Sequence, residues 1–317
     1  FGRKLPLATL FDAPTVGRLA EVLAQGSPAA GSCLVSIQPA GRSRPLFLIH
    51  DGTGEVLGYR TLARRLGTER PVYGFQWAGR AAEEAGALTV EALATRYVQE
   101  LQRAQPQGPY YLGGYCGGGT VAYEMAQQLT ARGERVALLA LIDAFNWARL
   151  PPPSRRERWR FDAERLEFLV RNYFHLPAGA RQHLRRDKAA ELAARLKQMR
   201  TRGLRQVWRA DSAPMAAALR AYQAQPYPGR VLDVRPRVQH RRLLGEGAKW
   251  GQLALGGAEV IVLPAHAGGV LPEPLVQHLA EALRKSLAAA DAATDPGPVL
   301  VAARPAGVTA MGRDTAS

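Results

Sequence analysis

Cysteine and histidine are scarce in this chain, with two and six residues in 317. Two cysteines cannot build a disulfide framework, so we expect a protein of a reducing, cytoplasmic compartment. No apolar run is long enough to span a membrane, and the first residues do not have the pattern of a signal peptide. We therefore predict no membrane partner. The cysteines and histidines also lack the spacing of a zinc site, and we expect no metal.

Acidic residues are also few, because 27 Asp and Glu stand against 42 Lys and Arg, for a formal net charge of +15. The surplus is concentrated between Pro151 and Ala210, where sixteen basic residues stand against six acidic ones. Such a stretch can attract nucleic acid or an acidic partner. No aromatic RNA-binding signature accompanies it, so we interpret it as a solvated, arginine-rich helical surface and expect no nucleic-acid partner. A basic nucleic-acid binder remains an alternative that rests on charge alone.

The chain does have a regular alternation of apolar strands and amphipathic helices from Cys33 onward. Hydrophobic residues make up 47% of the sequence, enough for a large core. The strand-like segments are 34–38, 45–50, 71–77, 110–115, 135–145, 230–238 and 259–265. The segments with helical spacing are 56–67, 89–105, 118–133 and 271–290. This alternation predicts an α/β fold with a mostly parallel central sheet. It is interrupted at 151–210, where a charged helical insertion is expected to lie over one end of the sheet.

The two ends of the chain differ from this region in composition. Residues 1–25 predict two short helices, and GSPAAGS at 26–32 predicts a linker. Residues 291–317 are rich in Ala, Pro, Thr and Gly and predict a disordered tail. The first residues resemble the middle of a domain, so we expect further chain upstream. The main domain is thus predicted at 33–290.

The most informative short stretch is GYCGG, residues 114–118, at the joint between a strand and a helix. It fits the nucleophile elbow G-x-S-x-G, with Cys116 in place of serine and Tyr115 before it. Because the backbone of the nucleophile is strained in such a turn, Gly114 and Gly118 must lack bulk. The N–H of Gly117 would point at a carbonyl under attack, and the helix that begins there favours a thiolate. The alternatives are an inert cysteine in a tight turn or a weak dinucleotide-binding loop.

A thiol nucleophile needs a base, and the base needs an orienting acid. Asp143 ends the apolar strand ALLALI, and His266 follows the last strand. Both are therefore expected at the carboxyl edge of the sheet, where ligands of open α/β sheets bind. The order Cys116, Asp143, His266 is that of α/β-hydrolases. Taken singly, Asp143 could be a helix cap and His266 a loop histidine.

The second half of an oxyanion hole is expected from the loop after an early strand. HDGTG at 50–54 is that loop, and its glycines let the backbone approach a ligand closely. We predict Gly52 as the donor, with Thr53 as the next choice. His50 is assigned to shaping this loop rather than to acting as the base.

Together these segments resemble a type I thioesterase domain of a nonribosomal peptide synthetase or modular polyketide synthase, from roughly Leu34 to Ala288. The resemblance rests mainly on PLFLIHDGTGEVLGYRTLARRLG, GPYYLGGYCGGGTVAYEMAQQLTARGERVALLALID and VLPAHAGGVLPEPLVQHLAEAL. It implies an α/β-hydrolase fold whose helical lid is the insertion 151–210, a Cys-His-Asp triad, and no cofactor within the domain. LPLATLFDAPTVGRLAEVL is similar to the last two helices of a carrier domain, whose phosphopantetheine serine would lie upstream of Phe1.

The resemblance implies a chain-releasing enzyme at the end of a biosynthetic assembly line. It would accept an acyl or peptidyl thioester from a carrier domain and synthetase modules of the same polypeptide. Release would follow by hydrolysis, cyclisation or capture by an amine. The alternatives are a hydrolytic editing thioesterase and a non-catalytic module that docks carriers. The substrate-binding residues are not predicted beyond the lid.

The sequence departs from the common pattern of the resembled family in three places. Cys116 stands where serine is usual, HDGTG stands where glycines often fill the loop, and Ala265 precedes His266 where an acidic residue is common. Cysteine variants occur in this family and are associated with demanding second steps, the closure of β-lactones among them. The resemblance therefore implies an activated acyl-enzyme.

Overall fold

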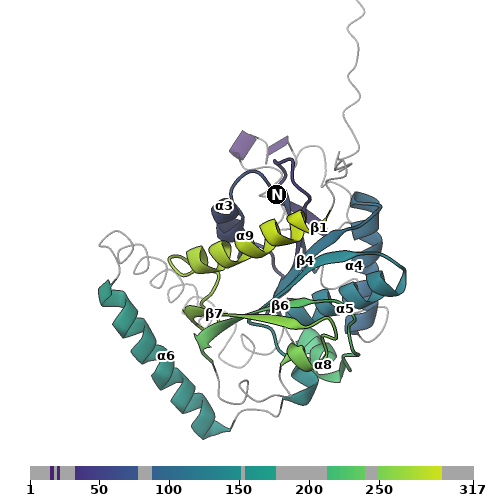
Figure 1. The fold of residues 1–317 in the computed structure, drawn as a ribbon. Helices are drawn as coiled ribbons and strands as arrows, with labels where there is room; N and C mark the ends of the chain where they lie inside the picture. The colour runs from purple at the N-terminus through teal and green to yellow at the C-terminus, as the bar shows by residue number, and fades with distance from the viewer. Residues whose placement is uncertain are drawn as a thin grey trace, which may run out of the picture.

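The computed structural model of the chain describes residues 15–17, 20–21, 33–77, 88–150, 154–175, 213–239 and 249–294. A seven-stranded sheet forms its centre (Figure 1). The strands are β1 (Leu34–Gln38), β2 (Leu46–Ile49), β3 (Val72–Phe75), β4 (Tyr110–Tyr115), β5 (Val136–Ile142), β6 (Val231–Val238) and β7 (Ala258–His266). All seven predicted strands are confirmed. The predicted carrier fragment lies almost entirely outside the described residues, and the linker and residues 295–317 lie wholly outside them. The predicted tail, 291–317, starts too early, because the last helix continues to Ala292 and Thr294 is buried.

The strand order places the carboxyl edge of the sheet where the site was predicted. The order is β1-β3-β2-β4-β5-β6-β7, and only the β1–β3 pair is antiparallel among the described strands. From β2 the chain moves to β3 on one side, and from β4 it moves to β5, β6 and β7 on the other. The order therefore reverses between β2 and β4. Open α/β sheets bind ligands outside the carboxyl ends of the strands at such a reversal.

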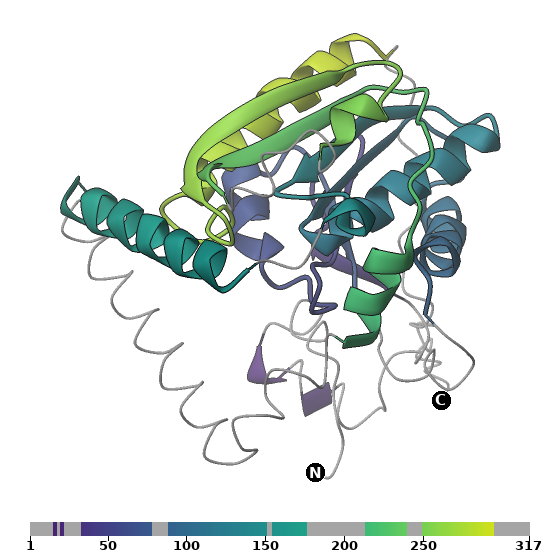
Figure 2. The same cartoon turned by 90° about the horizontal axis from the view of Figure 1, so that it is seen from below.

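Helices cover both faces of the sheet (Figures 1 and 2). On one face lie α3 (Tyr59–Leu66) and α9 (Val276–Ala292). On the other lie α4 (Val90–Ala104), α5 (Gly117–Ala131) and α8 (Ala213–Ala221). Thr89 caps α4 as predicted, since its hydroxyl accepts a hydrogen bond of 3.1 Å from the N–H of Ala92. The last helix begins five residues later than predicted, because a residue before proline is disfavoured in helical conformation and prolines occupy 272 and 274.

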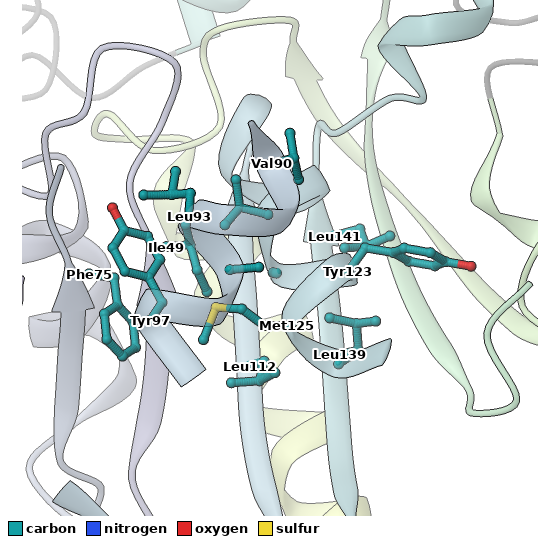
Figure 3. Close-up of a cluster of buried hydrophobic side chains, with 14 of the residues drawn as sticks. Ile49, Phe75, Val90, Leu93, Tyr97, Leu112, Tyr123, Met125, Leu139 and Leu141 are labelled. Carbon is teal, nitrogen blue, oxygen red and sulfur yellow. The ribbon is translucent and has the colours of Figure 1, made fainter. Parts of the chain in front are cut away.

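Two apolar clusters fix the sheet between these layers. The cluster under α4 and α5 is shown in Figure 3, where Met125 and Leu112 lie between a group around Tyr97 and another around Tyr123. The second cluster lies under α3 and α9 and includes Leu62. Each fully buried large apolar side chain contributes about 1.5–3 kcal/mol. The strand ends that carry the predicted site residues are therefore held from both faces.

A polar cluster fastens the end of α9 at the edge of the sheet opposite the predicted site. Arg70 is buried, donates to the Asp291 carboxylate, and lies over the Tyr111 ring at 4.9 Å from its centroid. The Tyr111 hydroxyl donates to Asp291 at 2.8 Å and lies 3.1 Å from the hydroxyl of Thr294. Tyr111 thus supports the fold from the amino end of β4, far from that strand's carboxyl end.

The predicted lid 151–210 is described in part. The 3-10 helix η3 (Trp147–Arg149) and helix α6 (Arg155–His175) follow β5, whereas 151–153 and 176–210 lie outside the described residues. Helix α6 stands apart from the two helical layers, beside the carboxyl ends of β6 and β7 (Figures 1 and 2). An insertion that leaves the sheet after β5 starts from its carboxyl edge, so α6 begins beside the predicted site.

Candidate active site

Cys116 joins β4 to α5 in a backbone conformation that side-chain-bearing residues rarely adopt, with φ 54° and ψ −121°. The turn packs so closely that a β-carbon at Gly114 would lie 2.2 Å from the Gly118 carbonyl oxygen. A β-carbon at Gly118 would lie 1.9 Å from the carbonyl oxygen of His50. Residues two before and two after Cys116 must therefore be glycine, as the elbow motif predicts. The strain at Cys116 is maintained by this packing.

The thiol of Cys116 is neutral in this environment. Its side chain keeps partial exposure, yet burial raises its pKa to about 12, and the negative charge of Asp143 contributes to the same shift. A hydrogen bond from the Gly117 backbone acts in the opposite direction. The helix terminus was predicted to favour a thiolate, but burial outweighs it. Attack on a carbonyl from this position therefore requires a base.

Alkylation of Cys116 by iodoacetamide should rise about tenfold for each pH unit between pH 7 and 10, because only the thiolate reacts and its fraction is small throughout. Peptide mapping by mass spectrometry would separate this site from Cys33, whose pKa burial also raises to about 12. A rate that is already on a plateau at neutral pH would contradict this prediction, since it would indicate a preformed thiolate.

Gly52 and Gly117 lie next to each other at the carboxyl ends of β2 and β4. The β-carbon position of Gly117 is 3.7 Å from the Gly52 nitrogen. In the loop after β2, the N–H of Thr53 donates to the Asp51 carboxylate at 2.7 Å, and the N–H of Gly54 donates to the Asp51 carbonyl at 3.1 Å. Among the described residues, no group accepts a hydrogen bond from the N–H of Gly52. Gly52, rather than Thr53, therefore offers a donor to a ligand.

His50 is fully buried behind this loop. Its Nδ1 lies 2.5 Å from the carbonyl oxygen of Asp51, and since a carbonyl only accepts, Nδ1 carries the proton. The Asp51 carbonyl and the Gly52 N–H belong to one trans peptide group and point in opposite directions. Because His50 holds the Asp51 carbonyl toward its imidazole ring, the Gly52 N–H points away from that ring. Burial lowers the pKa of His50, so the imidazole stays neutral.

Asp143 follows β5 with a positive φ of 46° and is almost fully buried. Its carboxylate accepts hydrogen bonds from the N–H of Gly268 at 3.1 Å and from the side chain of Gln239 at 3.4 Å. Burial raises the pKa of Asp143 to about 7, while these two hydrogen bonds lower it and the charge of Asp233 raises it further. Because Gly268 follows His266 by two residues, Asp143 anchors the loop that carries the predicted base.

His266 ends β7, and its side chain is almost fully buried. Nδ1 lies 2.9 Å from the carbonyl oxygen of Ala267, so Nδ1 carries the proton and Nε2 keeps the lone pair that a base needs. The ring lies against Gly269, where a β-carbon would come within 2.3 Å of the imidazole. Phe168 of α6 meets the imidazole edge to face, with centroids 5.7 Å apart and planes at 76°. Helix α6 thus contacts the predicted base directly.

The structure brings the predicted site residues to one edge of the sheet. The β-carbon position of Gly268 is 3.9 Å from the hydroxyl of Tyr115, so the histidine loop passes beside the elbow. Sequence reasoning missed Gln239, Gly269 and Tyr59. Gln239 directly follows β6, so the strand-end argument that pointed to Asp143 could have found it. Gly269 lies three residues after His266 in the same loop, whereas the hydroxyl of Tyr59 bonds to the ends of both β2 and β4, which no local pattern records.

The described part of the chain has neither a metal-binding cluster nor a membrane-spanning helix. None of its groups of His, Cys, Asp and Glu has three or more members arranged to hold a metal ion. None of its helices combines the length and the apolar character needed to cross a membrane. Both cysteines, Cys33 and Cys116, are free thiols.

The comparison with protein families agrees with this geometry. The family model described as "Thioesterase domain" matches residues 44–227, which is more than half of the chain. The chain belongs to the thioesterase domain family. The matched range of this thioesterase domain includes β2 to β5, the elbow, Asp143 and α6, but it ends before His266.

Known synthetases contain similar domains. The chain is 42% identical over 146 residues to malpibaldin synthetase of Mortierella alpina, covering 45% of this chain and 3% of that protein. It is 39% identical over 145 residues to a dimodular nonribosomal peptide synthase of Bacillus subtilis, covering 45% of this chain and 6% of that protein. The thioesterase domain thus spans only a few per cent of the length of these curated relatives.

Solved thioesterase domains share the fold. The NocB thioesterase domain, solved as a covalent complex with a fluorophosphonate nocardicin G analogue, matches with a TM-score of 0.59 and 25% identity. That match covers 80% of this chain and 99% of the NocB domain. A four-domain nonribosomal peptide synthetase matches with a TM-score of 0.62 and 25% identity, covering 90% of this chain and 22% of that one. The α/β-hydrolase fold predicted from the sequence is therefore confirmed.

Proposed function

We propose that this thioesterase domain takes an acyl or peptidyl chain from the phosphopantetheine of a carrier domain onto Cys116 and then releases it. The observation that carries the proposal is the strained elbow at Cys116, with the open N–H of Gly52 beside it. The similarity to nonribosomal peptide synthases supports the substrate class. The carrier and synthetase modules upstream in the same polypeptide, and a carrier remnant at residues 1–25, are part of the proposal.

In the first step, Nε2 of His266 removes the proton of Cys116, and the sulfur attacks the thioester carbonyl. The N–H groups of Gly52 and Gly117 hold the oxyanion that forms. The bond between the acyl carbon and the phosphopantetheine sulfur then breaks, and the proton on His266 goes to the leaving thiol. Asp143 keeps the imidazole oriented by anchoring the histidine loop through the N–H of Gly268, and its negative charge stabilises the charged form of the ring. The acyl group is now a thioester of Cys116.

In the second step, His266 removes a proton from water, an amine or a nucleophile within the acyl chain as that group attacks the acyl carbon. The bond between the acyl carbon and the Cys116 sulfur then breaks, and the proton on His266 goes to the sulfur. Exchange of one thioester for another is nearly balanced, so the acyl group on cysteine stays activated. Attack by a weak amine or closure of a strained ring then needs less help from the enzyme than it would from a serine ester. The reaction uses no cofactor in this domain beyond the phosphopantetheine that delivers the substrate.

The test of this function is the intact mass of the protein after incubation with an activated thioester, such as octanoyl thiophenyl ester. A gain of one octanoyl group located on Cys116, followed by release of octanoate, supports a chain-releasing or hydrolytic thioesterase. A chain that never gains the acyl mass would instead favour a non-catalytic module that docks carriers. Absence of salt-sensitive DNA binding at low salt would remove the nucleic-acid alternative.

The contact between Phe168 and His266 leads to a prediction about the fate of the acyl group. Phe168→Ala should open space for water beside the imidazole, because the aromatic edge that covers part of the base is removed. With octanoyl thiophenyl ester and added benzylamine, we expect the ratio of free acid to amide to rise roughly threefold to tenfold. Product analysis by liquid chromatography and mass spectrometry measures this ratio.

The matched control is Leu166→Ala on the same helix, since the Leu166 side chain is 62% exposed. This variant should keep the wild-type ratio of acid to amide. Equal ratios in Phe168→Ala, Leu166→Ala and the wild type would show that α6 does not govern access of water to the acyl-enzyme.

A further inference from the structure

The hydroxyl of Tyr59 lies between the two strands whose ends carry the proposed oxyanion donors. Tyr59 is the first residue of α3 and is almost fully buried. Its hydroxyl donates to the carbonyl of Ile49 at 2.6 Å and accepts from the N–H of Tyr115 at 2.9 Å. Ile49 is the last residue of β2, and Tyr115 is the last residue of β4. One side chain from a third segment therefore bridges the ends of two neighbouring strands.

The two backbone groups that Tyr59 bridges would otherwise be partners of each other. In a parallel pair, the carbonyl of one residue accepts a hydrogen bond from the N–H of the residue that follows its partner on the neighbouring strand. Ile49 is opposite Gly114, so the next ladder bond would join the Ile49 carbonyl to the N–H of Tyr115. The hydroxyl of Tyr59 is inserted into this bond. The strands are thus held apart by one oxygen atom at the point where they leave the sheet.

The position of this insertion fixes the distance between the oxyanion donors. Gly52 follows Ile49 by three residues, and Gly117 follows Tyr115 by two. On the other side, the carbonyl of His50 touches Gly118, where no β-carbon could fit. The gap between the loop after β2 and the elbow is therefore set from one side by the Tyr59 hydroxyl and from the other by the contact of His50 with Gly118.

We propose that Tyr59 is a positioning residue that sets the spacing of the Gly52 and Gly117 N–H groups by holding the ends of β2 and β4 apart through its hydroxyl. This role rests on the proposed function, because it concerns the stabilisation of the oxyanion formed when Cys116 attacks. Without the hydroxyl, the strands either close into a direct ladder bond or leave two buried backbone groups unpaired. Either change moves one donor relative to the other, and an error of about 1 Å in such a site can cost a hundredfold in rate.

The test compares two reactions of Cys116 in the full chain. Acylation by octanoyl thiophenyl ester forms an oxyanion, whereas alkylation by iodoacetamide at pH 9 needs the same thiol but forms none. Tyr59→Phe should lower the acylation rate constant by about tenfold to a hundredfold. It should leave the alkylation rate within about twofold of wild type, because no oxyanion donor takes part. A loss confined to acylation would not follow from a merely destabilised elbow.

The matched control is Tyr111→Phe on β4. This tyrosine is also fully buried, and its hydroxyl is also hydrogen-bonded, but at the opposite end of the strand. Thermal melts should show both variants destabilised, and only Tyr59→Phe should lose acylation.

If Tyr59→Phe does not fold, replacement of Tyr59 by 4-aminophenylalanine restores a donor of similar reach. Because its amine accepts only weakly from the N–H of Tyr115, that variant should still acylate more slowly than wild type with unchanged alkylation.

Two failures are distinguishable. A wild-type chain whose Cys116 takes up no octanoyl group would refute the proposed function and, with it, any role of Tyr59 in that reaction. An acylated wild type beside an equally fast Tyr59 variant would refute only the positioning role. Equal losses of acylation and alkylation, or an equal loss of acylation in Tyr111→Phe, would also overturn it.

Discussion

Replacing Cys116 with alanine should abolish acyl-enzyme formation and product release while leaving the fold intact. Alanine keeps the β-carbon and removes only the sulfur, so the strained φ of 54° is no harder to adopt than in the wild type. The covalent step has no substitute, and we expect turnover to fall at least about a thousandfold. Intact mass after incubation with octanoyl thiophenyl ester measures the adduct, and circular dichroism checks the fold. A variant that still gained the octanoyl mass would refute the assignment of Cys116.

Cys33→Ala is the matched control, because Cys33 is the other cysteine of the chain. It is 2% exposed, lies immediately before β1 and packs in the cluster under α4 and α5. The variant should acquire the acyl group at the wild-type rate, although loss of the buried sulfur lowers stability slightly. If Cys33→Ala were as inactive as Cys116→Ala, the wrong thiol would have been chosen.

Cys116→Ser tests the contribution of the sulfur atom separately from that of the elbow geometry. The hydroxyl occupies the same position, so an acyl-enzyme should still form, now as an oxygen ester. Because that ester is less activated toward amines, the share of amide formed with added benzylamine should fall relative to the free acid. The comparison therefore tests the reason proposed for a cysteine at this elbow.

The strands and their ends were predictable because local patterns determine them. Apolar runs such as ALLALI identify buried strands, and the carboxyl edge of a parallel sheet gathers whatever follows each run. Asp143 and His266 were predicted as site residues mainly by this argument. The start of α9 was placed too early, since helical spacing across Leu271 to Leu275 hid the effect of the two prolines on the residues before them.

Features that depend on contacts between distant segments could not be predicted. The insertion of the Tyr59 hydroxyl between β2 and β4 requires the register of two strands about sixty residues apart. The neutral state of Cys116 requires knowing how deeply the elbow is buried, because the helix terminus alone predicts the opposite shift.

Asp143→Asn should lower the turnover of the enzyme while it raises the stability of the fold. Asparagine has the same shape and, like aspartate, tolerates the positive φ of 46° at this position. If Asp143 orients His266 and stabilises its charged form, turnover should fall by about 10²–10⁴-fold, with the milder end favoured because a thiol ionises more readily than a hydroxyl. Acylation kinetics with octanoyl thiophenyl ester measure this loss. Wild-type turnover would mean that another carboxylate, such as Asp233, supports the base.

The same variant should be more stable than the wild type above neutral pH. Burial raises the pKa of Asp143 from its ordinary value of 3.8 to about 7, so the folded protein disfavours the ionised carboxylate. The resulting cost is absent below the ordinary value, grows as the pH rises, and is complete above about pH 7. Asparagine has no charge to bury, so the gain in the free energy of unfolding should be on the order of 1–3 kcal/mol at pH 8 and should vanish near pH 4.

Asp233→Asn is the control that makes this pattern specific to the site. Asp233 is equally buried on the neighbouring strand, and burial raises its pKa too, but its carboxylate pairs with Arg235, so its neutralisation leaves a largely buried cation without its partner. Urea denaturation at pH 8 should therefore show a smaller gain in stability for Asp233→Asn than for Asp143→Asn, with acylation largely kept in the first and lost in the second. A large gain in stability together with lost acylation in Asp143→Asn alone would identify Asp143 as a carboxylate kept buried at the expense of stability, as expected of a group retained for the chemistry of His266. A loss of stability in Asp143→Asn at pH 8 would show that the hydrogen bonds to Gly268 and Gln239 outweigh burial and that Asp143 is part of the structural framework.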